Sequence, residues 1–296
     1  MNIPITLSER LPPLLFLVRT VSSPKGAYFS SPGAPPLPGL LPVGWGSGGA
    51  RRPLRSGGFR VGMAWSLRGS DVGFEDKVRS GVVREADERH VREAVEALRG
   101  GKVIAVPTDT LYGFACDACY LEAVNRIYEI KGRKHTSPLA ICVGDVSDVD
   151  RFAVTDHLPN GLLDSLLPGP VTVILRRGES SMLEKSLNPG LESIGVRVPD
   201  SDFIRKIARG SGSALALTSA NLSGKPSSVS IKDFEDLWEH CALVYDSGVL
   251  PSGRAGSTIV DLMKPGLYRV LRPGSAMEET VATLEKHLLR EETTQT

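Results

Sequence analysis

The chain has 296 residues, of which 41% are apolar and 23% are charged, and its formal net charge is +1. This is the balance of an ordinary globular protein, and the overall charge demands neither nucleic acid, nor a membrane surface, nor an acidic partner. No apolar run of about eighteen residues or more occurs, so we expect no transmembrane helix. The four cysteines are too few for a disulfide framework in a chain of this length.

Residues 1–78 differ in composition from the rest of the chain. Ten of the 21 prolines precede residue 54, and residues 1–70 contain eight Lys or Arg but only one acid, Glu9. Such a segment cannot bury enough apolar surface to offset its ordering entropy, so we expect disorder. Scattered arginines with few acids are typical of a transit peptide, which predicts a mitochondrial or plastid location beside a cytoplasmic one. One alternative is a disordered tail. The other is an artefact of gene prediction that sets the start too far upstream, with Met63 as the alternative start.

The first predicted elements follow this segment. Glu85–Arg99 has apolar residues at helical spacing and precedes two glycines, which predicts a helix. Lys102–Val106 predicts a short buried strand that Pro107 ends. Leu121–Ile130 predicts the next helix.

Short apolar runs alternate with helical patterns in the rest of the chain. Strands are predicted at Leu139–Val143, Val171–Leu175, Gly195–Val198, Ala214–Leu217, Leu243–Tyr245, Thr258–Asp261 and Leu267–Leu271. Helices are predicted at Asp202–Arg209, Ile231–His240 and Met277–Arg290. This alternation predicts a single α/β or α+β domain over residues 79–291, followed by a short tail at 292–296.

Hydroxyl groups and cations follow several of the predicted strands. Pro107–Gly113 carries two threonines directly after a buried strand, where open α/β sheets place their ligands. The alternative is a strand-to-helix turn in which a threonine caps the helix. The other segments of this kind supply Thr172 and Arg176 on one strand face, Ser219 and Asn221 on one side of a loop, Ser257, and Arg272. No G-x-S-x-G elbow accompanies these serines, which argues against a serine nucleophile.

Lys131–Lys134 is a basic cluster just beyond a predicted helix. A cation about 4 Å from a phosphate charge contributes roughly 4 kcal/mol at an effective dielectric of about 20. Because the chain contains no G-x-x-x-x-G-K-[ST] string, such side chains would have to hold any polyphosphate. The alternative is a solvated helix end. Cys116 and Cys119 have C-x-x-C spacing, but without a second ligand pair we favour packing over zinc or redox chemistry.

In chain order, the motifs P-T-D-T-x-Y-G, K-G-R-x-x-x-x-P-L, P-G-P-x-T, V-R-x-P, S-A-N-x-S-G and L-R-P-G resemble those of the YrdC-like family of threonylcarbamoyl-AMP synthases. The resemblance covers roughly residues 85–290. It implies a single YrdC-like domain, in which helices flank a twisted mixed sheet with a concave ligand cleft. The implied reaction joins L-threonine, bicarbonate and ATP to give threonylcarbamoyl-AMP and pyrophosphate, a nucleotidyl transfer assisted by Mg²⁺. A separate threonylcarbamoyl transferase complex would then modify the adenosine next to the anticodon of tRNA.

The resemblance also implies site roles. The residues expected to contact threonine are Thr110, Cys142, Arg176, Ser219 and Ser257. Those expected to line ATP are Arg133, Ser137, Thr172, Asn221, Val229 and Arg272. Lys131 and Arg133 would face the phosphates and the carbamate as the catalytic pair. Cys142 stands where some longer family members carry a histidine. No protein metal site is implied.

Two alternatives to the synthase remain. The first is an RNA-binding module that uses the Lys131–Lys134 cluster and shows strong salt dependence without any need for threonine. The absence of aromatic residues among these cations argues against it. The second is a carbamoyl-transfer domain of a hydrogenase-maturation protein, which the length of the chain and the absence of paired zinc-finger-like cysteines disfavour.

Overall fold

A computed structural model describes residues 81–132 and 138–292, all within one unit of the chain that spans residues 64–296. The predicted N-terminal segment 1–78, the alternative start Met63, and residues 293–296 of the predicted tail lie outside the described residues. Within the described ranges, no helix has the length and apolar character needed to cross a membrane.

The described residues form one mixed sheet of eleven strands in the order β1-β8-β2-β3-β7-β4-β6-β5-β9-β10-β11. The strands are β1 (Val83–Glu85), β2 (Ile104–Pro107), β3 (Tyr112–Asp117), β4 (Ala140–Cys142), β5 (Val171–Arg176), β6 (Ser193–Arg197), β7 (Leu215–Ser219), β8 (Leu243–Asp246), β9 (Thr258–Asp261), β10 (Leu267–Arg272) and β11 (Arg290–Glu291). The sheet contains parallel pairs such as β4–β6 and β5–β9 and antiparallel pairs such as β3–β7 and β5–β6. The predicted mixed α/β class is confirmed.

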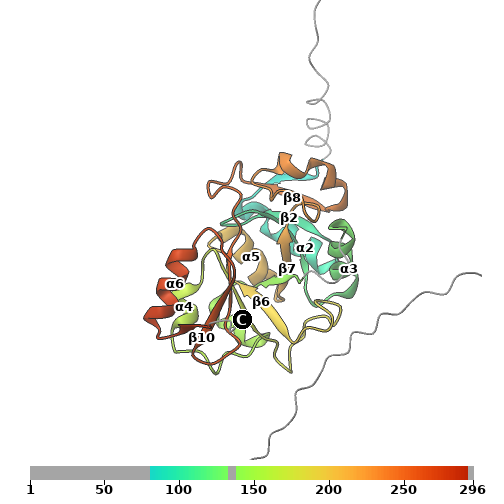
Figure 1. Cartoon of the computed structure of the whole chain (residues 1–296). Helices are drawn as coiled ribbons and strands as arrows, with labels where there is room; N and C mark the ends of the chain where they lie inside the picture. The colour runs from blue at the N-terminus through green and yellow to red at the C-terminus, as the bar shows by residue number, and fades with distance from the viewer. Residues whose placement is uncertain (1–80, 133–137, 293–296) are drawn as a thin grey trace, which may run out of the picture. The chain divides into compact units, whose positions relative to one another are not determined.

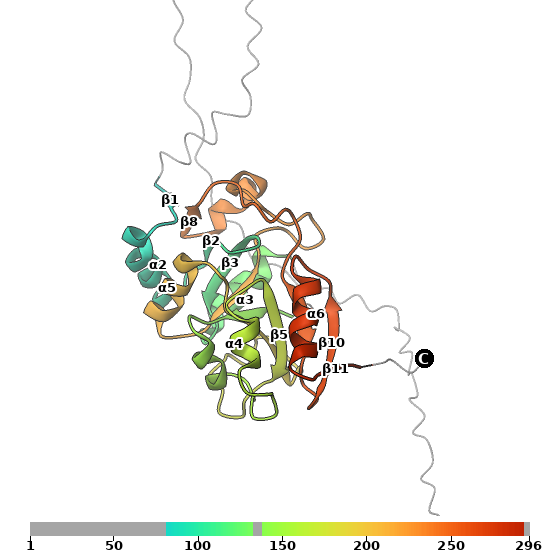
Figure 2. The ribbon, with the colours of Figure 1, turned by 90° about the vertical axis from the view of Figure 1, so that its left-hand side faces the viewer.

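Helices lie on both sides of this sheet (Figures 1 and 2). The α-helices are α2 (Val91–Arg99), α3 (Leu121–Ile130), α4 (Leu162–Leu166), α5 (Asp202–Ser211) and α6 (Met277–Lys286). The 3₁₀ helices are η1 (Glu88–His90), η2 (Val146–Arg151) and η3 (Ile231–His240). In both views α2 lies beside α5, and α4 lies beside α6.

The two sheet faces carry separate apolar clusters. On one face, α2 and α5 cover β8, β2, β3, β7 and the end of β4, and residues such as Leu98, Ile204 and Leu215 are buried there. The opposite face packs against α3, η3, α4 and α6, with Ile127 and Phe234 in its core. Each fully buried large apolar side chain contributes about 1.5–3 kcal/mol. Helices thus cover one end of the first face, and beyond α5 the same face forms the floor of a pocket.

Small residues shape this uncovered floor. The strand register places Ala140 opposite Leu217 on one side and opposite Gly195 on the other. A Cβ atom added to Gly195 would lie 3.1 Å from Thr172 Cγ2 and 3.4 Å from Ala140 Cβ. A larger side chain at this position would therefore crowd Thr172 and Ala140.

The structure corrects two of the predicted elements and rules out the alternative of a strand-to-helix turn. Pro107–Gly113 does not lead into a helix, because β2 turns back into antiparallel β3 with Pro107 opposite Tyr112. The predicted helix over 85–99 begins only at η1, where Asp87 accepts a hydrogen bond from the Arg89 amide. The last helix ends at Lys286, and the chain continues into β11. In addition, β4 does not lie next to β2, since β3 and β7 separate the two strands.

Gly274, in the L-R-P-G motif, provides a test of this packing. A Cβ atom there would overlap the backbone of Ser257 and Thr258, which cannot move aside as a flexible side chain can. We expect Gly274→Ala to destabilise the fold by about 1–3 kcal/mol and to lower Tm by roughly 3–10 °C. The matched control is Gly178→Ala, whose new Cβ atom would be 3.5 Å from its nearest neighbour, Phe152 O. Equal melting temperatures for the two variants would contradict the described contact.

Candidate functional site

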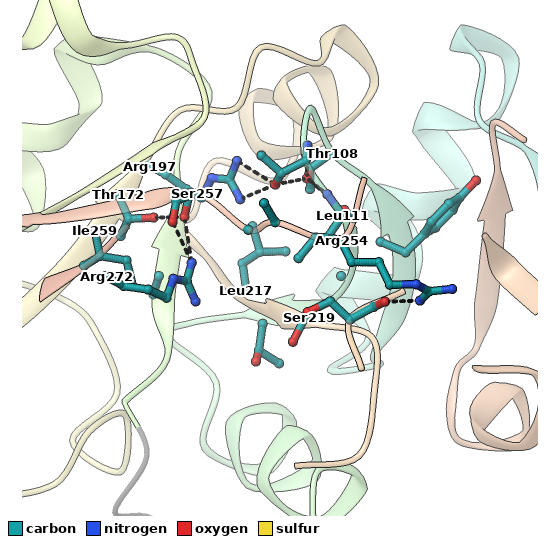
Figure 3. Close-up of a pocket in the computed structure, with 18 of the residues that line it drawn as sticks. Thr108, Leu111, Thr172, Arg197, Leu217, Ser219, Arg254, Ser257, Ile259 and Arg272 are labelled. Carbon is teal, nitrogen blue, oxygen red and sulfur yellow. Dashed lines mark hydrogen bonds between the residues drawn. The ribbon is translucent and has the colours of Figure 1, made fainter. Parts of the chain in front are cut away.

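A pocket of about 430 Å³ lies on the uncovered part of the sheet. Its lining comes from separate segments of the chain and includes Thr108, Thr110, Leu111, Tyr112, Gly113, Pro138, Ala140, Thr172, Arg197, Leu217, Thr218, Ser219, Ser227, Arg254, Ala255, Gly256, Ser257, Ile259, Arg272 and Pro273. Figure 3 shows Leu217 at its centre, Arg272 on one side and Arg254 on the other. A pocket of this size fits a small-molecule ligand.

The turn between β2 and β3 forms one wall. Thr108 Oγ1 accepts hydrogen bonds from the amides of Thr110 and Leu111 at 3.1 Å each, which fixes the tight turn. The hydroxyl oxygens of Thr108 and Thr110 are 3.2 Å apart, and Thr110 Oγ1 lies 3.4 Å from both terminal nitrogens of Arg197. Asp109 pairs with Arg197 and also accepts a hydrogen bond from the Asp200 amide at 2.9 Å.

β5, β9 and β10 supply the opposite wall. Thr172 Oγ1 and Ser257 Oγ are 2.7 Å apart, and Arg272 donates to Ser257 O at 2.8 Å. Burial, together with the charge of Arg197, lowers the pKa of the Arg272 guanidinium. Among the described residues no carboxylate lies within ion-pair distance of Arg272. This wall therefore carries an uncompensated cation and suits an anionic ligand.

A buried lysine lies behind the edge of the pocket. Lys131 is 1% exposed, and its ammonium donates to Ser219 O at 2.6 Å and to Asn221 Oδ1 at 2.8 Å. Ser219 Oγ donates to Asn221 Oδ1 at 2.6 Å, and Asn221 Nδ2 donates to Lys225 O at 2.6 Å. The network fixes the S-A-N segment. Lys131 itself is not part of the pocket lining.

The structure brings together five of the residues singled out from the sequence, namely Thr110, Thr172, Ser219, Ser257 and Arg272. Asn221 lines a neighbouring cavity of about 520 Å³. Val229 lies outside both linings and is held by its backbone, which donates to Asp233 and accepts from the Leu250 amide. Arg133 and Ser137 lie outside the described residues.

Two expected threonine contacts do not reach the pocket. Arg176 is exposed and lies opposite Ser193, four residues along β5 from Thr172 and therefore about 13 Å away along the strand. Cys142 lies beside Arg197 in the sheet register but is fully buried against α5, and burial raises the pKa of its thiol to about 12. At neutral pH this thiol stays protonated inside the core.

The sequence interpretation missed Arg197, Asp109 and Arg254 as site residues. The V-R-x-P motif contains Arg197, which closes the apolar run of β6 just as Arg272 closes that of β10. The signal was thus the same pattern of a polar residue at a strand end. Nothing comparable marks Arg254, which lies in a loop of mixed composition.

The described residues contain no group of three His, Cys, Asp or Glu side chains that could hold a metal ion. Cys116 is buried, and Cys119 Sγ accepts a hydrogen bond from Ser213 Oγ at 3.3 Å. Both thiols are free, and burial raises the pKa of each. No carboxylate is among the described residues that line the pocket, and Asp109, in the turn beside it, is bound to Arg197.

Comparisons with known proteins agree with this architecture. The Sua5/YciO/YrdC family model, described as "Telomere recombination", matches residues 96–274. The threonylcarbamoyl-AMP synthase of Bos taurus is 46% identical over 226 residues, which is 75% of this chain and 79% of the relative. The human protein of the same name is 47% identical over 66% of this chain and 71% of its own length.

Solved structures show the same fold. P. abyssi Sua5 complexed with L-threonine has a TM-score of 0.61 and 30% identity over 71% of this chain. E. coli YciO has a TM-score of 0.56 and 25% identity over 65% of this chain and 93% of its own. The present chain spans 61% of the Sua5 chain, so the two differ in length. By sequence and by fold, the chain belongs to the Sua5/YciO/YrdC family.

Proposed function

We propose that the protein is an L-threonylcarbamoyladenylate synthase, a nucleotidyltransferase that uses L-threonine, bicarbonate and ATP. The observation that carries this proposal is the pocket in which Arg197 and Thr110 on one wall face Arg272, Thr172 and Ser257 on the other. Relatives at 46–47% identity bear the name threonylcarbamoyl-AMP synthase, and the Sua5 structure holds threonine. Both facts concern those proteins and support the same activity here.

Two subsites follow from the two walls. Thr110, Ser219 and Arg197 would hold threonine, with Arg197 near its carboxylate in the place expected for Arg176. Thr172 and Arg272 on the opposite wall, with Asn221 in the neighbouring cavity and with Arg133 and Ser137, would line ATP, and Ser257 would reach threonine from the same wall as Thr172. Lys131 acts by holding Ser219 and Asn221 in place.

The chemistry fits a pocket of cations and hydroxyls. The threonine ammonium first loses a proton, the free amine attacks the carbon of bicarbonate, and loss of water leaves a carbamate. A carbamate oxygen then attacks the α-phosphorus of ATP as the bond to the β-phosphate breaks, and pyrophosphate leaves with the bonding electron pair. Because two anions must approach each other, positioning and charge neutralisation are the main catalytic demands. Mg²⁺ would enter with ATP as the substrate complex, bound mainly by the phosphates.

The activity implies a downstream partner, and the composition of the N-terminal segment bears on the location. The labile adenylate would pass to a separate threonylcarbamoyl transferase complex that modifies tRNA next to the anticodon. The Arg-rich composition of residues 1–78 supports an organellar form, in a mitochondrion or plastid, beside a cytoplasmic one. Weak RNA binding is compatible with synthase activity. An RNA-binding module without catalysis would differ from the synthase in its strong salt dependence.

The full-length chain should release pyrophosphate from MgATP only when threonine and bicarbonate are both present. Two measurements test this directly: the release of pyrophosphate, and the formation of the adenylate as monitored by chromatography of the nucleotides. Release that is indifferent to threonine would overturn the proposal. RNA binding titrated against salt would then be the next measurement.

Arg272→Ala should lower kcat/KM for ATP by about 10- to 150-fold, since a charge-assisted hydrogen bond contributes about 1.5–3 kcal/mol. Arg272→Lys should retain part of the activity, because it keeps the charge but loses the planar fork. Steady-state kinetics with ATP varied at saturating threonine test this. If Arg272→Ala shows wild-type kinetics, the assignment of Arg272 to the ATP site is wrong.

Lys131→Met keeps the length of the side chain but leaves Ser219 O and Asn221 Oδ1 without their ammonium donor. Ser219 O still accepts from the Asn221 amide and Asn221 Oδ1 from Ser219 Oγ, so the substitution removes two hydrogen bonds to a charged group. Each contributes about 1.5–3 kcal/mol, so Tm should fall and the KM for ATP should rise. Thermal melts and kinetics measured together separate the two effects. The control is Lys286→Met, at an exposed position on α6, for which neither quantity should change.

A further inference from the structure

The loop between β8 and β9 forms a wall of the pocket that none of the strand-end motifs explains. The Tyr112 hydroxyl donates to Gly248 O at 2.7 Å and so anchors the start of the loop. Ser252 Oγ contacts the carbonyl oxygens of Asp109 and Thr110 at 3.1 and 3.0 Å. At the other end, Gly256 O accepts from the Ser275 amide at 3.0 Å. The loop is therefore fixed at both ends and at its middle.

Arg254 is the cation that this loop carries. It lines both the main pocket and the neighbouring cavity, so it stands at their boundary. Its guanidinium is 3.1 Å from Asp233 Oδ1 and also donates to Ser227 O. Figure 3 shows the guanidinium directed away from Arg272, on the far side of Leu217. In this arrangement the side chain is held at the edge of the pocket.

The partner Asp233 does not depend on Arg254 for its own position. Its Oδ2 accepts hydrogen bonds from the amides of Val229 at 2.8 Å and Ser230 at 3.0 Å, as part of the capping box of η3. Although burial opposes the shift, the hydrogen bond from Arg254 and those two amides lower the pKa of the carboxyl group. The side chain of Arg254 is 50% exposed, and ion pairs this open to solvent add little net stability. Arg254 can therefore leave Asp233 at small cost.

The charge balance of the pocket leaves a role for such a cation. Asp109 already neutralises Arg197, and Arg272 is the one lining arginine without a carboxylate partner among the described residues. A leaving pyrophosphate carries more negative charge than a single guanidinium compensates. We propose that Arg254 is a further phosphate-binding residue, held by Asp233 and Ser227 in the empty pocket and turned onto the pyrophosphate group of ATP when the nucleotide binds. This inference rests on the proposed function.

Exchange of labelled pyrophosphate into ATP, in the presence of threonine and bicarbonate, tests this role with the full-length protein. Arg254→Ala should raise the KM for pyrophosphate by about ten- to a hundredfold and leave the KM for threonine unchanged. The KM for pyrophosphate of Arg254→Lys should lie between that of the wild type and that of Arg254→Ala. The matched control is Arg269→Ala, which removes an arginine that is 47% exposed and also 3.1 Å from an aspartate, Asp261. Its KM values should equal those of the wild type.

Calorimetric titration of pyrophosphate alone measures the same contact without turnover. An Arg254→Ala variant with a normal Tm but unchanged pyrophosphate affinity and KM would overturn the inference while the synthase activity stands. A change confined to the KM for threonine would also overturn it. If the wild type fails to exchange but binds pyrophosphate through Arg254, the proposed function falls and the anion site remains. Arg254→Gln replaces Arg254→Ala in both measurements if the alanine variant does not fold.

Discussion

The ion pair between Asp109 and Arg197 is the interaction on which the site depends. It joins the β2–β3 turn to the end of β6, although β7 and β4 lie between β3 and β6 in the sheet. Both side chains are more than nine-tenths buried, so removal of either partner would leave an uncompensated charge, at a cost of about 3–5 kcal/mol. The pair thereby holds the Thr110 hydroxyl beside a guanidinium, an arrangement that can bind a carboxylate.

A second constraint is that the sheet is covered unevenly. α2 and α5 bury the face of the sheet over β8, β2, β3 and β7, and the same face is open to the pocket over β6 and β5. The small residues Gly113, Ala140 and Gly195 leave room above the open part of the sheet, while Thr172 and Ile259 close its far side. The fold thus separates stability from binding, because the helix-covered part of the sheet holds an apolar core and the uncovered strands supply the ligand floor.

In the proposed synthase, side chains from distant segments take the place of a phosphate loop. A glycine-rich loop would offer backbone amides at a helix end, whereas this site offers arginines and hydroxyls at strand ends. Such a site needs its side chains held in position, and the hydrogen bonds of Lys131 to the S-A-N segment and of Ser252 to the β2–β3 turn do this. The same arrangement explains why so many polar groups near the pocket are bound to one another.

The sequence by itself determined the mixed α/β class, most strand positions, and the motif segments whose hydroxyls and cations meet in the pocket, because apolar periodicity and strand-end polar residues are local properties of a chain. Only the tertiary structure decided which of these residues lie at the pocket. Arg176 and Arg197 both end apolar runs, yet the register sends one to solvent and the other to Thr110. Cys142 lies in a motif strand but under α5, and Lys131 lies in a basic cluster but is 1% exposed. These outcomes depend on strand order and helix packing, which bring together residues far apart in the chain and are therefore absent from any local pattern.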